Sequence, residues 1–370
     1  MKILIEAIGI EKPGGGRSAT VNLLENIFLL DSENIYTVIL SQHENFLDRF
    51  ANVHQVIVPF HNRFLARIWA QMVIPIRFKN IDIIHFTKNL SVFGIKVPQI
   101  ITIHDLTTII FPQFFPWLDV FYWKTIEKFS VQRADLIIAV SRNTANDIVK
   151  YYGIEPRKVK VIYHGRSSIF SPASADEIAN IHKKYDLPEK YLITVGRIDL
   201  KKNLTNLVKA FSIIQNQIDP NLKLVLVGEI YKKCEDKNLT PTIQDMGLMD
   251  KVIFAGRVPD ADLPSLYSGA IACAFPSLHE GFGLVGLEAM ACGVPIITHN
   301  SSAIVEVVGA AGVKVDATNV DELADALTRV INDESLRVQM KLSGLERSKE
   351  FDWKITARMT IESYQQVNTQ

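Results

Sequence analysis

The sequence predicts an α/β protein with two doubly wound parallel sheets, and its length and hydrophobic pattern carry the prediction. The chain has 370 residues, which is too long for one ordinary core and suits two domains of roughly 150 residues. Short runs rich in Ile and Val recur, each followed by a polar turn and often by a helical pattern. Continuous apolar strands that alternate with helices are typical of parallel sheets covered on both faces. The pattern occurs twice, which predicts two such domains.

The predicted strands fall into two series. In the first half they are KILIEAIGI, YTVILS, HQVIVP, IDIIHF, QIITIHD, DLIIAVS and KVKVIYHG, and in the second half YLITVGR, LKLVLVGE, KVIFAGR, IACAFPS, VPIITHN and AGVKVD. Ser, Pro and Ala interrupt the pattern between residues 165 and 180. We therefore expect one domain over 1–168 and a second over 169–352, with a hinge near 165–175 and a last helix within 353–370.

Composition excludes several classes of protein. Lys plus Arg equals Asp plus Glu at 40 each, so nothing draws the chain as a whole to nucleic acid. The three cysteines lack metal-ligand spacing, and two of them sit in apolar runs, which is typical of a reduced compartment. The sequence contains no run of about 18 or more uncharged apolar residues, which is the length needed to span a membrane. We expect a cytoplasmic protein that binds no nucleic acid.

Ligands of doubly wound sheets bind at the carboxyl ends of the strands, so residues just after strands are the candidates for a site. Gly15 and Gly16 lie between the first strand and a helix expected from about Ser18, where backbone N–H groups could hold a phosphate or a sugar oxygen. A flexible turn explains these glycines equally well. His104 and Asp105 follow a buried strand, and His104 is expected to project as a hydrogen-bonding group.

The second half offers cations and carboxylates after its strands. Arg197 and Lys202 share one short loop, where they could converge on a diphosphate; a solvated charge cluster is the alternative. Glu280 lies in a glycine-rich turn, and Glu288 lies in the apolar helix that follows. Because an unpaired buried carboxylate is costly, Glu288 must accept hydrogen bonds, from ribose hydroxyls or from a core side chain.

With these residues collected, the chain resembles the retaining GT-B glycosyltransferases of family four, also called glycosyl transferases group 1. EGFGLVGLEAMACGVPII is similar to the E-x7-E signature of that family, GRIDLKKN to its diphosphate clamp, TIHDL to its acceptor-domain histidine and GGGR to its glycine loop. The likeness covers nearly the whole chain and is most specific from 192 to 316. It implies two Rossmann-like domains that face a central cleft, with the helix of 353–370 packed back on the first.

The resemblance also implies roles for individual residues. Glu288 would bind the ribose, Glu280 the hydroxyls of the donor sugar, and Arg197 and Lys202 the leaving diphosphate, while His104 would bond the donor sugar or the acceptor. Further expected contacts with the donor come from the first glycine loop, the base pocket and the turn after Glu280, and they are Gly15, Gly16, Arg257, Val258, Phe282, Gly283 and Leu284. Neither a metal nor another cofactor is expected.

The expected function is retaining transfer of a hexose from a nucleotide sugar to a polysaccharide, oligosaccharide or lipid-linked acceptor. UDP-glucose or a similar UDP-hexose is favoured as donor. A GDP-mannose-dependent mannosyltransferase and a non-catalytic two-lobed binding protein stay as alternatives. A phosphorylase lacks a recognisable pyridoxal phosphate lysine, and a dehydrogenase lacks the dinucleotide fingerprint.

The acceptor side leaves a membrane contact open. Residues 60–79 carry four cations, Arg63, Arg67, Arg77 and Lys79, among apolar residues, and an aromatic cluster follows from 111 to 123. Such a segment can rest on the inner face of an anionic membrane, or it can be a helix that packs on its own sheet.

Overall fold

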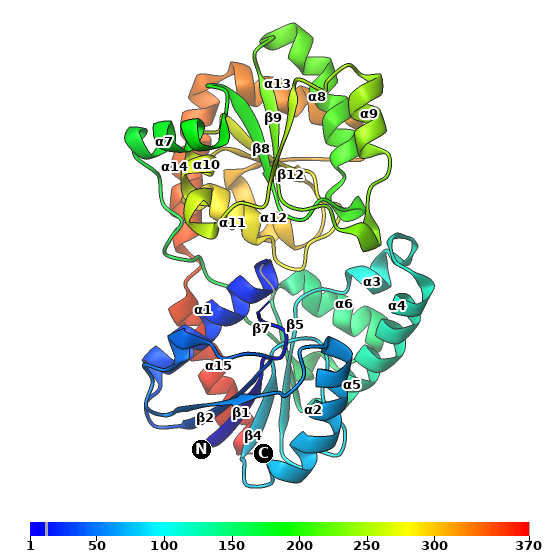
Figure 1. Ribbon diagram of the computed structural model, residues 1–370, viewed down its shortest axis with the longest axis vertical. Helices are drawn as coiled ribbons and strands as arrows, with labels where there is room; N and C mark the ends of the chain where they lie inside the picture. The colour runs from blue at the N-terminus through cyan, green and yellow to red at the C-terminus, as the bar shows by residue number, and fades with distance from the viewer. Residues whose placement is uncertain (12–13, 370) are drawn as a thin grey trace. The chain divides into compact units, whose positions relative to one another are not determined.

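The computed structural model describes residues 1–11 and 14–369, and they form two compact units. The first consists of Met1–Pro112, Pro116–Gly165 and Asp352–Gln370, and the second of Gln113–Phe115 and Arg166–Phe351. Figure 1 shows each unit as a central sheet covered by helices. In the described part of the chain, none of the helices is long and apolar enough to cross a bilayer.

The first unit holds a seven-stranded parallel sheet of order β3-β2-β1-β4-β5-β6-β7. Its strands are β1 (Lys2–Glu6), β2 (Ile35–Leu40), β3 (Val53–Ile57), β4 (Ile83–Phe86), β5 (Gln99–Ile103), β6 (Leu136–Ala139) and β7 (Val159–Val161). Its helices are α1 (Gly15–Leu30), α2 (Arg63–Arg77), α3 (Thr107–Ile110), α4 (Trp117–Tyr122), a π-helical turn (Trp123–Glu127), α5 (Lys128–Arg133), α6 (Arg142–Tyr152) and α15 (Trp353–Asn368).

Alternating residues of β4 assign the helices to the two faces of this sheet. Ile84 and Phe86 belong to the core cluster that contains buried residues of α2, α5 and α6. His85 points the other way, where its Nδ1 lies 2.8 Å from the hydroxyl of Tyr364 in α15, which packs beside α1. Figure 1 shows this arrangement, with α1 and α15 on one face and α2 and α5 on the other.

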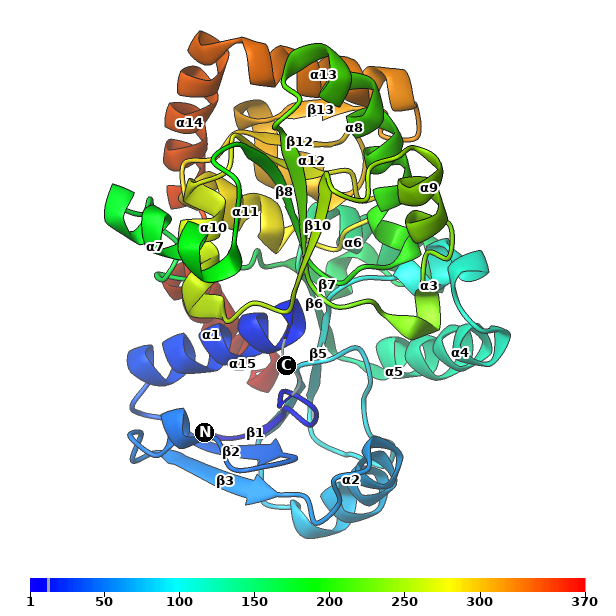
Figure 2. The ribbon, with the colours of Figure 1, turned by 45° about the horizontal axis from the view of Figure 1, so that its top comes forward.

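The second unit holds a six-stranded parallel sheet of order β10-β9-β8-β11-β12-β13. Its strands are β8 (Tyr191–Val195), β9 (Lys223–Val227), β10 (Val252–Gly256), β11 (Ala272–Phe275), β12 (Ile296–His299) and β13 (Val313–Val315). Its helices are α7 (Ala175–Tyr185), α8 (Leu204–Ile218), α9 (Leu239–Asp245), α10 (Leu263–Ser268), α11 (Leu284–Ala291), α12 (Ala303–Val308), α13 (Val320–Asn332) and α14 (Glu334–Lys349). Figure 2 shows α8, α9 and α13 around this sheet.

The predicted fold class is confirmed, because every predicted strand is present and both sheets are parallel. In each sheet the chain winds outward in both directions from a central pair, β1 with β4 and β8 with β11. A ligand site of such a sheet lies where the order reverses. The expected start of α1 was wrong by one turn: the helix begins at Gly15, not at Ser18.

Apart from the short segment Gln113–Phe115, the chain passes between the units after Gly165 and again after Phe351. Each crossing is fixed locally. A Cβ on Gly165 would lie 2.1 Å from the backbone nitrogen of Trp353, so only glycine fits there. Within the second unit, the N–H of Arg166 donates to the carbonyl of Phe351 at 2.9 Å.

Candidate active site

The loops after β8 and β11 form the candidate site of the second unit. The two strands are neighbours and parallel, so their carboxyl ends lie at the same edge of the sheet. The loops are joined by a backbone hydrogen bond from the N–H of Leu278 to the carbonyl of Lys201 at 2.9 Å. The Lys201–Lys202 pair and Glu280, far apart in the sequence, are thereby brought to one place.

Glu280 is the centre of this cluster. Its Oε1 accepts hydrogen bonds from Lys202 Nζ at 2.8 Å and from the hydroxyl of Ser277 at 2.6 Å. Its Oε2 lies 3.6 Å from Lys201 Nζ. The three charged side chains are only 12–13% exposed. The cluster is therefore an ion triad largely shielded from solvent, in which charges interact more strongly than they would in open water.

The triad sets the protonation of Glu280. Burial on its own would raise the pKa of this carboxyl, but the charges of Lys201 and Lys202, with the hydrogen bonds from Lys202 and Ser277, lower the pKa to about 2. Glu280 is thus ionised at neutral pH and is a poor proton acceptor. It can orient hydroxyl groups or stabilise positive charge, but it is not suited to act as a general base.

Backbone conformations that are rare outside glycine hold the triad in place. Gly196, after β8, has a φ of +129°, and a Cβ there would come within 3.3 Å of the end of Lys202. On the other side, the hydroxyl of Ser302 accepts the N–H of Glu280 at 3.1 Å. Ser302 itself has a φ of +67°, which is a strained value for a residue with a side chain. Such strain is kept only where the surroundings enforce it.

Arg197, the second predicted cation of the loop, has a different partner in this structure. Its guanidinium lies 4.5 Å from the centroid of the Tyr231 ring, in a cation–π contact. Lys202 instead pairs with Glu280. Lys201, the residue before Lys202, is the other lysine that pairs with Glu280. A diphosphate would compete with Glu280 for Lys202. Arg197 differs, because the ring of Tyr231 carries no charge that could neutralise the guanidinium.

Glu288, the second acid of the motif, lies on α11 and is partly exposed. The hydroxyl of Tyr267 donates to its Oε2 at 3.1 Å. Burial raises the pKa of this carboxyl to about 8, although Tyr267 acts in the opposite direction, and the charge of Asp260 raises it further. The influence of Asp260 shows that the loop after β10, which carries exposed Arg257 and buried Val258, lies near Glu288.

The turn between the two glutamates presents the start of α11. Phe282 is buried, and Gly283 caps the helix with a φ of +102°, without a side-chain cap. A Cβ on Gly283 would lie 2.5 Å from Ile304, and one on Gly286 would lie 2.6 Å from the same side chain. Glycine at both positions therefore lets α11 pack closely on α12. The helix begins at Leu284, so its first N–H groups face the loop of Glu280.

His104, a predicted site residue of the first unit, lies directly after β5. Its Nε2 is 2.8 Å from the carbonyl of Thr87 and must carry the proton, because a carbonyl only accepts. Its Nδ1 lies 3.4 Å from Nε2 of His164, which can donate to it. Burial lowers the pKa of His104, so the ring is neutral at pH 7. Both ring nitrogens of His104 therefore have protein partners in this structure.

A half-buried amide, Asn89, and a buried acid, Glu127, organise the loop of His104. The side-chain oxygen of Asn89 accepts the N–H of His104 at 3.1 Å, while its NH₂ group donates to the carbonyl of Asp105 and to Glu127. Glu127 is 2% exposed, and burial raises its pKa to about 8. It is the last residue of the π-helical turn, an irregularity that is frequent at functional sites.

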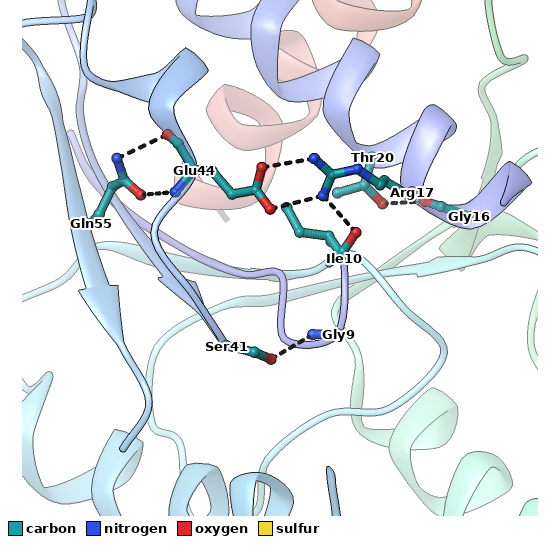
Figure 3. Close-up of polar contacts among 8 residues, drawn as sticks. All are labelled: Gly9, Ile10, Gly16, Arg17, Thr20, Ser41, Glu44 and Gln55. Carbon is teal, nitrogen blue, oxygen red and sulfur yellow. Dashed lines mark hydrogen bonds and ion pairs between the residues drawn. The ribbon is translucent and has the colours of Figure 1, made fainter. Parts of the chain in front are cut away.

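The glycine loop stands at the start of α1, as Figure 3 shows. Gly15 and Gly16 are the first residues of the helix and are exposed. Arg17 anchors this end: its guanidinium binds both oxygens of Glu44 at 2.8 Å and the carbonyl of Ile10 at 2.8 Å. A Cβ on Gly16 would meet nothing within 4 Å. Packing of the chain itself therefore does not require glycine at position 16.

The chain contains one Asp-x-Asp sequence, Asp260-Ala261-Asp262, whose two carboxylates are candidate metal ligands. Asp262 Oδ2 accepts hydrogen bonds from Lys184 Nζ and from the hydroxyl of Tyr185, both at 2.6 Å, so this carboxylate has a structural role. Within the described residues, no three His, Cys, Asp or Glu side chains gather as metal ligands would.

Sequence reasoning missed several residues that shape the site. They contact the predicted residues only after folding, and they are Thr87, Asn89, Glu127, His164, Tyr267, Ser277 and Ser302. A position just after a predicted strand was the available indication for three of them: Thr87 follows β4, and Ser277 and Ser302 lie two and three residues after β11 and β12.

The fold and the site define a GT-B glycosyltransferase, and comparison with known proteins gives its family. The family description "Glycosyl transferases group 1" matches residues 177–347, and "Glycosyltransferase Family 4" matches residues 31–167. The O-antigen chain mannosyltransferase B of Escherichia coli is 31% identical over 264 residues, which cover 71% of this chain and 69% of that one. The chain belongs to this glycosyltransferase family.

Other relatives match over part of their length or in fold alone. The serotype-specific mannosyltransferase WbdA of Escherichia coli is 30% identical over 66% of this chain, which spans only 30% of WbdA. Anabaena HepE, solved in complex with UDP and glucose, has a TM-score of 0.79 and 23% identity, with 98% and 99% of the two chains covered. The sucrose-phosphate synthase of Thermosynechococcus elongatus has a TM-score of 0.79 and 21% identity, covering 99% and 98%.

Proposed function

We propose that the protein is a retaining mannosyltransferase that moves mannose from GDP-mannose to a growing polysaccharide or to a lipid-linked glycan. One observation favours this donor over the UDP-glucose expected from the sequence: the O-antigen chain mannosyltransferase B and the serotype-specific mannosyltransferase WbdA match at 31% and 30% identity over 71% and 66% of the chain. The likeness to HepE, at 23% identity, supports the fold and gives little weight to UDP-glucose.

In this proposal the triad binds the diphosphate of the donor. Lys202 exchanges Glu280 for a phosphate oxygen, and Arg197 adds a second cation from the same loop. As the glycosidic bond breaks, negative charge grows on the leaving diphosphate, and preorganised cations stabilise that state more than the ground state. Glu280, ionised and released from Lys202, then accepts hydrogen bonds from the hydroxyls of the sugar. Phe282, Gly283 and Leu284 supply N–H groups to the sugar or phosphate.

The nucleoside occupies the part of the same unit next to the triad, at α11. Glu288 accepts hydrogen bonds from the ribose hydroxyls, and the backbone near Arg257 and Val258 contacts the base. On the first unit, Gly15 and Gly16 approach the transferred sugar. His104 bonds the sugar or the acceptor when its Nδ1 exchanges the contact with His164 for a ligand hydroxyl. The acceptor attacks the anomeric carbon from the face that the phosphate leaves. The departing phosphate can therefore take the proton of the acceptor hydroxyl. Because the new bond forms on the same face as the broken one, the configuration at the anomeric carbon is retained.

Donor identity is tested by assaying transfer and hydrolysis with GDP-mannose, UDP-glucose and UDP-galactose at equal concentrations. The proposal expects GDP-mannose to be turned over at least tenfold faster than the other two. Turnover of a UDP-hexose in its place would overturn the mannosyltransferase while leaving the glycosyltransferase chemistry of the site intact.

The ribose role of Glu288 predicts that donor affinity depends on pH. With a pKa of about 8 in the free protein, Glu288 is mostly protonated at pH 7 and must ionise to accept two hydroxyls. Affinity is therefore expected to rise with pH by up to about tenfold per unit from pH 6 and to level off above pH 8. Calorimetry with the nucleotide sugar, whose diphosphate has no pKa in this range, should show release of a proton at pH 7.

The matched control is Glu288→Gln, which should bind the donor more weakly and show no pH dependence between 6 and 8.5. Tyr267→Phe should move the rise in affinity to higher pH, because the Tyr267 hydroxyl lowers the pKa of Glu288. A pH-independent affinity in the parent protein would refute the role.

Gly16→Ala tests the close approach of a ligand to the start of α1. Because the space is open and the position is helical, the substitution should stabilise the fold by about 0.5–1 kcal/mol. Transfer should nevertheless fall by about 10- to 100-fold, since a methyl group would hold the sugar away from its reacting position. Thermal unfolding and initial rates measure the two effects, with Ser18→Ala as control. Unchanged transfer would show that no ligand approaches Gly16.

A further inference from the structure

We propose that the first unit docks on an anionic lipid bilayer through an amphipathic surface formed by α2, Phe93 and the segment from α4 to α5. We call this the docking surface. It lies outside the residues assigned to the donor and does not depend on which sugar is transferred. The argument rests on exposed apolar side chains, on their continuity and on the cations beside them.

Helix α2 is apolar on two opposite sides. One side, formed by Ala66, Ala70 and Ile74, is buried in the core of the first unit. The other side carries residues that lie two positions before or after these three. Two positions correspond to a rotation of about 200° around the helix axis, so these residues face the opposite direction. These side chains are exposed by 73%, 44%, 63% and 67%, respectively, at Phe64, Ile68, Met72 and Ile76. Packing on the sheet therefore explains only one of the two apolar stripes.

The exposed stripe continues onto neighbouring elements. Gln71 of α2 donates to the carbonyl of Ser91 at 3.1 Å and accepts the N–H of Phe93 at 3.1 Å, which fixes this loop beside the helix. The exposed ring of Phe93 packs edge-on against the exposed ring of Phe129 in α5, with 5.0 Å between centroids. Farther along lie three more exposed side chains, Trp117, Leu118 and Phe121. The views in Figures 1 and 2 place α2, α4 and α5 on the same side of the first sheet.

The docking surface is also cationic, although the chain as a whole is neutral. Residues 60–79 contain four cations and no acid. Of the two acids between residues 117 and 133, Glu127 is buried. The other, Asp119 of α4, is half-buried and is outnumbered by the exposed cations. The exposed cations on or next to these elements are Arg77, Lys96, Lys124, Lys128 and Arg133. Apolar side chains that enter the acyl boundary, with Lys and Arg at the headgroups, are the chemistry of an interfacial membrane contact.

The same charges favour a bilayer over a second copy of this chain. A two-fold dimer through the docking surface would place the surface against itself, so its cations would face cations. An anionic bilayer satisfies both features, because it supplies negative headgroups and an apolar interior. Docking there would hold the first unit beside an acceptor that is carried on a lipid.

The test is sedimentation of the full chain with vesicles of phosphatidylcholine alone and with vesicles that contain phosphatidylglycerol. We expect binding only to the anionic vesicles, weakened by salt. The double variant Met72→Ser/Ile76→Ser should lower vesicle affinity by at least tenfold, and each of Lys124→Gln and Lys128→Gln by about fivefold. The matched control is Met249→Ser/Leu342→Ser, whose residues are each 61% exposed elsewhere on the chain.

All these side chains are exposed, so the melting temperature should change little in the variants, and hydrolysis of the donor in solution should match that of the parent. Failure of the parent to bind anionic vesicles would overturn the proposal. So would equal binding to both kinds of vesicle, or an equal loss in the control variant. Self-association of the parent that Met72→Ser/Ile76→Ser abolishes, without vesicle binding, would assign the surface to a second copy.

Discussion

Lys202→Met is expected to lower the rate of sugar transfer by about 100- to 1,000-fold, the largest effect of any single substitution in this chain. Lys202 is only 12% exposed and lies at the strand-end edge where the donor diphosphate is proposed to bind. A fixed cation at a developing negative charge contributes more in the transition state than in the ground state, and its loss therefore lowers kcat. Binding of GDP should weaken by about tenfold or more as well, because a charge-assisted hydrogen bond is lost.

Lys201→Met is the matched control for this substitution. The neighbouring lysine is equally shielded, but its Nζ lies 3.6 Å from Glu280, whereas that of Lys202 lies at 2.8 Å. The proposal therefore expects a much smaller effect on kcat for Lys201→Met. Both variants lose one cation from the triad, so comparable melting temperatures would show that the difference is catalytic. Equal losses of rate in the two variants would remove the specific role of Lys202.

Glu280→Gln is expected to reduce transfer by about 100-fold or more while nucleotide affinity is kept or increased. Glu280 neutralises Lys202 in the free protein, with a pKa lowered to about 2, so it competes with the donor diphosphate for this lysine. The amide keeps the shape of the side chain and removes the charge. GDP should then bind equally well or more tightly, but the hydroxyls of the sugar lose an ionised acceptor.

Single-turnover rates and calorimetry with GDP separate these two effects. Glu322→Gln serves as control, because the carboxylate of Glu322 also accepts a hydrogen bond within the second unit, from the N–H of Asp316. Loss of GDP affinity in parallel with transfer would contradict the separation, since it would place Glu280 on the nucleotide and not on the sugar.

The fold could be predicted because its strands are buried on both faces. A strand such as β8, which reads YLITV, is apolar at nearly every position, so it stands out without any knowledge of its partners. Turn residues then mark its end. The first turn of α1 was misplaced because Gly15 and Gly16 are poor helix formers, although the backbone there is helical in the structure.

The candidate site could be predicted only in part. Lys202 and Glu280 were found because both follow strands, and the parallel pairing of β8 with β11 brings them together across 78 positions of sequence. The partners of Glu288 and His104 could not be found in this way. Tyr267 reaches Glu288 from α10, and Thr87 reaches His104 from the end of β4, through contacts that exist only in the folded chain.

The docking surface is a second feature that the sequence could predict only in part. The sequence of residues 60–79 left two alternatives open, a helix packed on its own sheet and a membrane contact. Periodicity shows that a helix has apolar residues but not which of its sides contacts the core. The structure separates the two sides: Ala70 is buried, while Met72, two positions on, is 63% exposed.

The central claim is that the Lys202–Glu280 cluster and Glu288 form a donor nucleotide site, and calorimetric titration tests it most directly. GDP, UDP and ADP would each be titrated into the parent protein and into Glu288→Gln, with and without chelator. The account predicts that GDP binds most tightly to the parent, that chelator does not weaken it, and that Glu288→Gln loses about tenfold or more in affinity. Absence of binding by all three nucleotides, or equal affinity of the parent and Glu288→Gln, would contradict it and leave the two glutamates with structural roles alone.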